Sequence, residues 1–119
     1  METVQMRVAS HNNIPVFSFI GHCKPEGLAE LSPKLSAFAV SGIKKFVFDF
    51  SACKLINSPA MGELLDAILL IDRDFEGHIV VCGLDSLKET LFTVSGILQI
   101  VQATPDIPEA LKLLENIEE

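Results

Sequence analysis

Ser58 is the side chain whose type and position in this sequence most clearly suggest chemistry. It follows Asn57 and lies between an apolar run at residues 46–50, typical of a buried strand, and an amphipathic pattern that predicts a helix over residues 58–75. A helix N-terminus has unpaired N–H groups and the positive end of the helix dipole, so it favours added negative charge. Ser58 is therefore either a plain N-cap or a phosphorylation site, and position alone favours the cap because capping serines are common.

Asp49, near the end of the apolar run, is a second candidate. A carboxylate at the end of a central strand can handle a metal or a phosphate. It can equally cap the following polar loop through backbone hydrogen bonds, and we favour this interpretation. The histidines His11, His22 and His78 have no spacing that suggests metal ligands, so the sequence predicts no metal site.

The three cysteines, Cys23, Cys53 and Cys82, are odd in number and form no C-x-x-C motif. This pattern argues against a disulfide framework and against a zinc site. Cys82 falls in an apolar run and is expected to pack in the core. Cys53 is close to Ser58 in the sequence, but only Lys54 among its sequence neighbours would lower its pKa, so a redox role has little support.

The sequence contains no recognisable catalytic motif. Ser58 does not lie in a G-x-S-x-G elbow, and no His/Asp pair has a recognisable relation to it. A phosphate-binding loop and a dinucleotide-binding fingerprint are also missing. We therefore expect no catalytic residue, no cofactor and no enzymatic activity.

The first residues predict a hairpin. Residues 4–8 and 15–20 have strand-like patterns, the turn His11-Asn12-Asn13 lies between them, and Gly21 ends the second strand. Helical periodicity follows over residues 25–41.

Pro33 interrupts that helical pattern. Either the helix bends at Pro33, or Ser32-Pro33 begins a helix after a separate turn. Gly42 is expected to end the helix.

The second half of the chain predicts alternating strands and helices. In chain order these are a central strand at 45–50, the helix at 58–75 ended by Gly77, a strand at 78–82, a helix at 86–94, a strand at 97–101, and a last helix opened by the capping box Asp106-Ile107-Pro108-Glu109. This order indicates an α/β fold with a mixed sheet of about five strands and helices packed mainly on one face. The length fits one domain over residues 1–119.

Composition narrows the classes of function. The chain has 9 basic and 16 acidic residues, a net charge of −7, which argues against nucleic acid because phosphate binding needs a basic surface. The longest apolar block, residues 67–71, is far too short to cross a bilayer, and the N-terminus lacks the layout of a signal peptide. We expect a cytoplasmic protein with no membrane insertion.

Two linked motifs resemble a known family. They are Phe48-Asp49-Phe50-Ser51 and Ile56-Asn57-Ser58-Pro59-Ala60-Met61-Gly62-Glu63-Leu64-Leu65. Together they resemble the central signature of the STAS domain, the fold of bacterial anti-sigma factor antagonists. The resemblance continues at residues 80–84, 91–97 and 108–111, in the right order and over nearly the whole chain.

The resemblance implies a regulatory protein that acts in transcription by binding an anti-sigma factor. In family members that act as switches, this partner is also a kinase that phosphorylates the serine at the position of Ser58, and phosphorylation releases the complex. The resemblance places partner binding at the same helix start. The residues it implies are Asn57, Ser58, Pro59, Ala60, Met61 and Gly62.

Several residues depart from the family pattern. Asn57 stands in place of Asp, Pro59 in place of Ser or Thr, and Ala60 in place of Gly, while His22-Cys23-Lys24 follows Gly21 where an acidic residue is frequent. These differences keep a second interpretation open. The chain would then be a STAS adaptor subunit, never phosphorylated, of a larger signalling scaffold or a lipid-transport complex.

Overall fold

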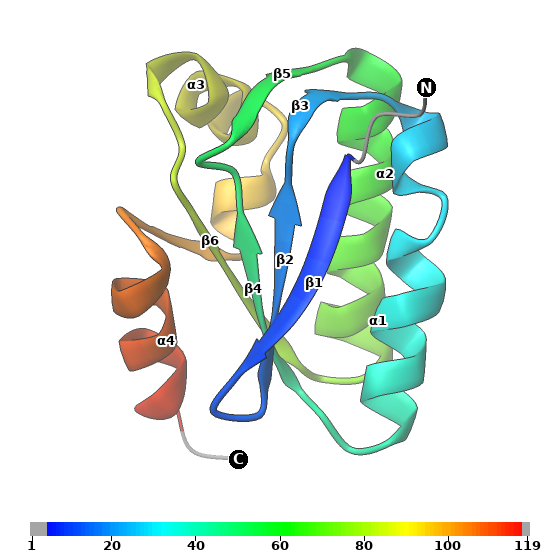
Figure 1. The fold of residues 1–119 in the computed structure, drawn as a ribbon, viewed down its shortest axis with the longest axis vertical. Coiled ribbons are helices and arrows are strands. Elements are labelled where there is room, and N and C mark those ends of the chain that lie inside the picture. Colours follow the sequence, from blue (N-terminus) through cyan, green and yellow to red (C-terminus); the bar gives the residue numbers. More distant parts are fainter. Residues whose placement is uncertain (1–4, 118–119) are drawn as a thin grey trace.

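A computed structural model describes residues 5–117, in which five strands form the central sheet in the order β1-β2-β4-β6-β7 (Figure 1). β1 and β2 are antiparallel, and the other neighbouring pairs are parallel. The strands are β1 (Met6–His11), β2 (Ile14–Phe19), β4 (Lys45–Asp49), β6 (His78–Cys82) and β7 (Gln102–Thr104). The predicted α/β fold with a mixed five-stranded sheet is confirmed.

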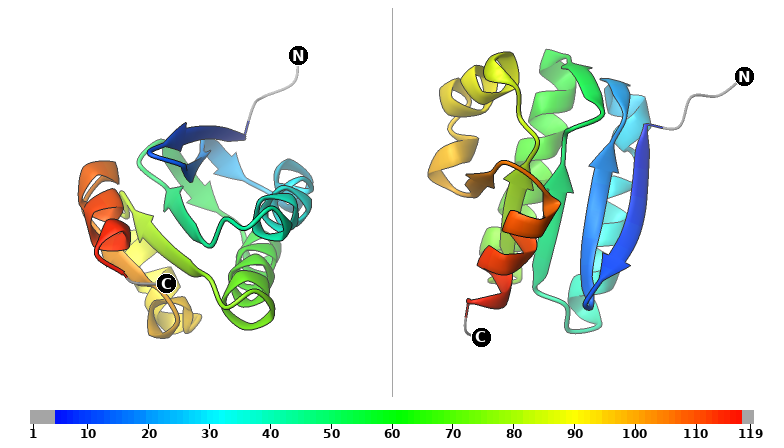
Figure 2. Two further views of the ribbon diagram at one scale, coloured as in Figure 1. Left: turned by 90° about the horizontal axis from the view of Figure 1, so that it is seen from below. Right: turned by 60° about the vertical axis from the view of Figure 1, so that its left-hand side comes forward.

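Helices cover this sheet unequally (Figure 2). α1 (Leu31–Val40) and α2 (Ser58–Leu69) pack on one face, and α4 (Ile107–Glu115) packs on the other. α3 (Ser86–Val94) lies at the end of the sheet where β4 and β6 finish (Figure 1). α1, α2 and, through Phe92, α3 contribute to the larger core, so the described helices pack mainly on one side of the sheet, as predicted, and α4 packs on the other.

Side chains alternate along the central strands and contribute to two separate hydrophobic cores. In β4, Phe46 and Phe48 belong to the larger core under α1 and α2, whereas Val47 belongs to the smaller core under α4. Successive side chains of a strand point to opposite faces, and a strand covered on both faces is apolar throughout. This arrangement explains why the middle of β4, Phe46 to Phe48, is apolar throughout.

Phenylalanine rings connect the sheet to α3. Phe19 and Phe50 stack with ring centroids 4.7 Å apart, and Phe50 meets Phe92 of α3 edge-on at 5.0 Å. All three rings are buried. Each such pair contributes about 0.5–1.5 kcal/mol beyond its buried area. The rings thus hold α3 against the end of the sheet.

A second sheet of two strands continues beyond the central one. β3 (Gly21–Cys23) and β5 (Cys53–Ile56) pair in parallel. Gly21 has a φ of 73°, and its N–H donates to the carbonyl oxygen of Ala52. The sequence predicts that Gly21 ends the second strand. β2 does end just before it, at Phe19, but the chain turns at Gly21 and continues as a further strand, β3.

The predicted turn after β1 is confirmed. Asn12 and Asn13 both adopt positive φ, 54° and 66°, a conformation that asparagine tolerates. β1 begins at Met6, and Val4, which the sequence assigned to this strand, lies outside the described residues.

The structure adopts the second alternative at Pro33. A 3-10 turn at Pro25–Leu28 precedes α1, which begins at Leu31, so Pro33 lies in the first helical turn. Its missing N–H costs no hydrogen bond there. Gly42, with a φ of 105°, follows the end of the helix as predicted.

The predicted strand at residues 97–101 is wrong. Ile97–Gln99 forms a 3-10 turn, and the fifth strand is β7, whose residues are mostly exposed. Ile97 and Val101 are both buried, and the N–H of Val101 donates to the carbonyl oxygen of Ile97. Apolar residues spaced this way fit a helical turn, whereas the edge strand carries little apolar signal.

The remaining predicted elements agree with the structure. β6 and α3 have the predicted bounds, and α2 continues through a π-helical turn, Leu70–Asp74, to Phe75. A Cβ at Gly77 would lie 2.8 Å from the carbonyl oxygen of Lys44, so close packing requires this glycine. Asp106 caps α4 by accepting a hydrogen bond from the N–H of Glu109. Every helix within residues 5–117 falls short of the length and apolar character needed to cross a bilayer.

Candidate functional site

The start of α2 lies at the upper end of the molecule in Figure 1, next to the two-stranded sheet. The chain leaves β4 at Asp49, passes through β5 and reaches Asn57, whose N–H donates to the carbonyl oxygen of Cys23 at 3.2 Å. The first residue of the site is therefore tied directly to β3.

Asn57, not Ser58, is the N-cap of α2. Its backbone is extended, with a φ of −79° and a ψ of 166°, and its Oδ1 accepts a hydrogen bond from the N–H of Ala60 at 2.9 Å. Ser58 is the first helical residue, and none of the hydrogen bonds found within residues 5–117 involves its hydroxyl. The interpretation of Ser58 as a plain cap is therefore wrong, because the preceding asparagine already supplies the capping hydrogen bond.

The residues expected to bind a partner differ in exposure. Asn57, Ser58, Pro59 and Gly62 are exposed, and Met61 is partly buried. A Cβ built on Gly62 meets no atom within 4 Å, so the surface there is open. Ala60 is fully buried in the larger core and cannot contact a partner.

Exposed apolar side chains lie at the same end of the molecule. Leu55 of β5 is 44% exposed and Leu87 of α3 is 57% exposed. β5 leads directly into α2, and α3 lies at the same end of the molecule, on the other side of β5 in Figure 1. The exposed surface at this end therefore combines a polar helix start with apolar side chains suited to contact with another protein.

Asp49 closes the loop that follows β4. Its Oδ1 accepts a hydrogen bond from the N–H of Ser51, and its Oδ2 accepts one from the Ser51 hydroxyl, both at 3.1 Å. The hydroxyl of Ser18 also donates to Oδ2, at 3.4 Å. This arrangement confirms the loop-capping interpretation. Within the described residues, no group of three or more His, Cys, Asp or Glu side chains could hold a metal ion.

Cys82 is the core thiol that the sequence predicts. It is fully buried in β6, and its thiol donates to Oδ1 of Asp49 at 3.6 Å. Burial, together with the nearby carboxylate, raises the pKa of Cys82 to about 12. This thiol is therefore protonated at neutral pH.

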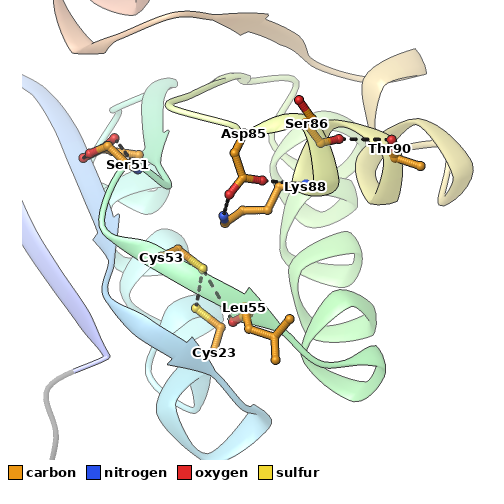
Figure 3. Close-up of polar contacts among 9 residues, drawn as sticks. Cys23, Ser51, Cys53, Leu55, Asp85, Ser86, Lys88 and Thr90 are labelled. Carbon is orange, nitrogen blue, oxygen red and sulfur yellow. Dashed lines mark hydrogen bonds and ion pairs between the residues drawn. The ribbon is translucent and has the colours of Figure 1, made fainter.

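Cys23 and Cys53 form a close pair that the sequence does not reveal (Figure 3). Both are buried free cysteines, and their sulfur atoms lie 3.5 Å apart. The cysteines are 30 residues apart, and only the pairing of β3 with β5 brings them together. A sequence signal for this pairing is missing because both strands are short and partly exposed.

Lys88 is the second residue that the sequence does not reveal. It is 2% exposed, and its Nζ forms an ion pair with Oδ2 of Asp85 at 2.6 Å. In Figure 3 this ion pair lies above the two thiols. The hydrogen bond between the two thiols, together with the charge of Lys88, lowers the pKa of the Cys53 thiol against the opposing effect of burial. The same hydrogen bond and burial raise the pKa of Cys23.

Comparisons with known proteins rest on structure alone. No model of a protein family matches the chain, and no curated protein matches its sequence significantly. Among solved structures, an anti-sigma factor antagonist from Mycobacterium paratuberculosis matches with a TM-score of 0.77 and 17% identity, covering 93% of each chain. A STAS domain protein from Planctomyces limnophilus matches with a TM-score of 0.78 and 16% identity, covering 95% of this chain and 99% of its own.

A third similar structure is the Bacillus cell fate determinant SpoIIAA in its phosphorylated form. It matches with a TM-score of 0.72 and 14% identity, covering 91% of this chain and 97% of its own. All three proteins cover nearly the whole described fold, although their sequences are distant. The chain therefore has the STAS fold of the anti-sigma factor antagonists.

Proposed function

We propose that this chain is a regulatory protein of the anti-sigma factor antagonist type. In this proposal residues 1–119 act as one binding module in the cytoplasm, without catalysis of their own. The start of α2 binds a protein partner, an anti-sigma factor that is also a serine kinase. Phosphorylation of Ser58 by this partner ends the binding.

The observation that carries the proposal is the division of roles between Asn57 and Ser58. Asn57 caps α2, so the exposed hydroxyl of Ser58 has no structural task among the described residues. In a serine that served as the cap, modification would esterify the capping oxygen itself, and phosphate oxygens would have to take over its hydrogen bond. Here a kinase can modify the hydroxyl without any cost to the cap.

Electrostatics at the helix start supports phosphorylation without unfolding. A phosphate adds about −1.5 to −2 charges, which the positive end of a helix dipole tolerates. The first turn of α2 carries no acidic side chain that would repel it. The fold is similar to SpoIIAA in its unphosphorylated form, with a TM-score of 0.75, and in its phosphorylated form, with 0.72. This likeness to both forms supports a switch that leaves the backbone unchanged, in which the effect of the phosphate would fall on the partner's surface.

The partner would contact a surface of mixed character. Leu55 of β5 precedes the polar Asn57 and Ser58, Met61 lies in the first turn of α2, and Leu87 belongs to α3 at the same end of the molecule. An interface buries apolar side chains at its centre, and a charge left there without a partner costs several kcal/mol, typically about 2–5. A phosphate at Ser58 would thus act by desolvation and repulsion.

A permanent adaptor role is the second candidate, and one observation favours it. Pro59 has no N–H, and the N–H of Ala60 already donates to Asn57, so few donors in the first turn remain for a phosphate. In this role the same surface would hold the chain in a larger signalling scaffold or a lipid-transport complex, with Ser58 never modified.

Mass spectrometry of the protein purified from its native host separates the two candidates. The switch predicts a phosphorylated fraction at Ser58 that disappears in a Ser58→Ala strain. A matched control is Ser10, an exposed serine of β1 at the other end of the molecule, which should carry no phosphate. Unmodified Ser58 under all growth conditions, together with a stable complex, would favour the adaptor.

A further inference from the structure

The pair of buried thiols between β3 and β5 is the strongest feature that the proposed function leaves unused. The sulfur atoms of Cys23 and Cys53 lie 3.5 Å apart, whereas a disulfide needs about 2.05 Å. The strands that carry them are already hydrogen-bonded in parallel, with Cys53 opposite Gly21 and Cys23 opposite Ile56. The two cysteines are not directly opposite each other, so bond formation requires the sulfurs to approach by about 1.5 Å and the short strands to adjust locally.

We propose that Cys23 and Cys53 are a reversible redox site that forms a disulfide when the protein meets a hydroperoxide such as hydrogen peroxide. This inference does not depend on the proposed function of Ser58. It assigns disulfide formation to two side chains that otherwise only pack in the hydrophobic core.

The chemistry assigns different roles to the two thiols. The Cys53 thiolate attacks one oxygen of hydrogen peroxide, an S–O bond forms, the O–O bond breaks, and the departing hydroxide takes a proton to become water. The Cys23 sulfur then gives up its proton and attacks the sulfur of the Cys53 sulfenic acid. The S–S bond forms as the S–O bond breaks, and a second water leaves. Two thiols and one peroxide give one disulfide and two waters.

The surroundings favour Cys53 as the attacking group. The two sulfurs lie within hydrogen-bond distance and either thiol can be the donor; with Cys23 as the donor the bond stabilises a thiolate at Cys53, and the buried ammonium of Lys88 adds positive charge. Burial of the sulfur opposes this effect, and so, more weakly, does Asp85, whose side chain is 61% exposed and screened by solvent. The net result is a lowered pKa for Cys53, and a thiolate is the reactive form of cysteine.

Local opening of the short sheet gives the oxidant access. Cys23 and Cys53 are 1% and 4% exposed, but Ala52, Lys54 and Leu55 beside them are exposed. A two-stranded sheet is only marginally stable by itself, so it opens more readily than the central sheet. Cys82 provides an internal control, because it lies in the central sheet, faces Asp49 and has a raised pKa.

The disulfide would lie close to the start of α2. The carbonyl oxygen of Cys23 accepts a hydrogen bond from the N–H of Asn57, the cap of that helix. We therefore expect oxidation to change the hydrogen-exchange rate of the Asn57 amide.

The test is treatment of the folded full-length chain with hydrogen peroxide, followed by alkylation of the remaining thiols and peptide mapping by mass spectrometry. The expected product links the peptides of Cys23 and Cys53 with the loss of two hydrogen atoms, and leaves Cys82 as a thiol. A dithiol reductant should restore the starting mass. The Cys82→Ser variant should form the same link, whereas Cys23→Ser and Cys53→Ser should not.

Two outcomes would overturn the proposal. One is that the folded protein, checked by circular dichroism, keeps both thiols under conditions that convert a dithiol peptide to its disulfide. The other is that Cys82 is oxidised as fast as the pair, which would indicate general unfolding. The peptide map of the wild-type protein shows whether the disulfide forms, even if a variant fails to fold.

A second variant tests the part assigned to Lys88. Lys88→Met keeps the length of the side chain and leaves Asp85 in solvent. Without the ammonium the pKa of Cys53 rises, so oxidation at neutral pH should slow several-fold and its pH profile should move to higher pH. An unchanged profile would contradict the role of Lys88.

Discussion

The central sheet and the two-stranded sheet both contain cysteines, but the two sheets differ in burial and in the groups that surround these thiols. In β4 every residue from Phe46 to Asp49 is buried, whereas in β5 only the first and last residues, Cys53 and Ile56, are buried. Cys82 of the central sheet is a protonated core thiol, but Cys53 lies beside a second thiol and a buried cation. We therefore expect most of the stability to reside in the central sheet, whereas the two thiols proposed to react lie on its short extension.

The largest expected effect belongs to the central sheet. Phe48 is fully buried and contacts the rings of Phe17 and Phe19. Phe48→Ala should lower the free energy of unfolding by about 3–5 kcal/mol, because it removes buried area and leaves a cavity. Chemical denaturation followed by circular dichroism measures this value. A loss below about 1 kcal/mol, the size of an ordinary surface effect, would contradict the assignment of stability to this sheet.

The next effect tests which residue caps α2. Asn57→Ala should cost about 1 kcal/mol, because the N–H of Ala60 loses its acceptor. Asn57→Asp keeps an acceptor and should retain most of the stability. Thermal melts of the two variants give the comparison. Equal stability of Asn57→Ala and the wild type would mean that the cap lies elsewhere.

The smallest stability effect should belong to Ser58. Ser58→Ala is expected to change the free energy of unfolding by less than about 0.5 kcal/mol, since the hydroxyl is exposed and makes no hydrogen bond in the described structure. Denaturant titration alongside Asn57→Ala provides the test. If Ser58→Ala proves the more damaging of the two, the division of roles between cap and modifiable hydroxyl is wrong.

The strongest sequence signals came from elements that are buried on one or both faces. The bounds of β6 and α3, the central position of β4 and the cap at Asp106 follow from apolar periodicity and capping chemistry. The place of Ser58 at a helix start was likewise predictable. These features depend on residues close together in the chain.

Features that depend on distant residues were not predictable. The pairing of β3 with β5 joins segments 30 residues apart, so neither Cys23 beside Cys53 nor the hydrogen bond from Asn57 to Cys23 leaves a local pattern. Lys88 looks like a surface residue of an amphipathic helix until the fold buries it. The edge strand β7 was missed because its residues are mostly exposed.

The most direct test of the proposed switch is binding of Ser58→Asp to the anti-sigma partner that is isolated with the wild-type protein from its native host. A titration should show binding weakened by at least about tenfold, while Ser58→Ala and the distant control Ser10→Asp bind like the wild type. Melts of each variant check that the fold is intact. Wild-type affinity in Ser58→Asp would contradict the switch and leave the permanent adaptor as the account of this surface.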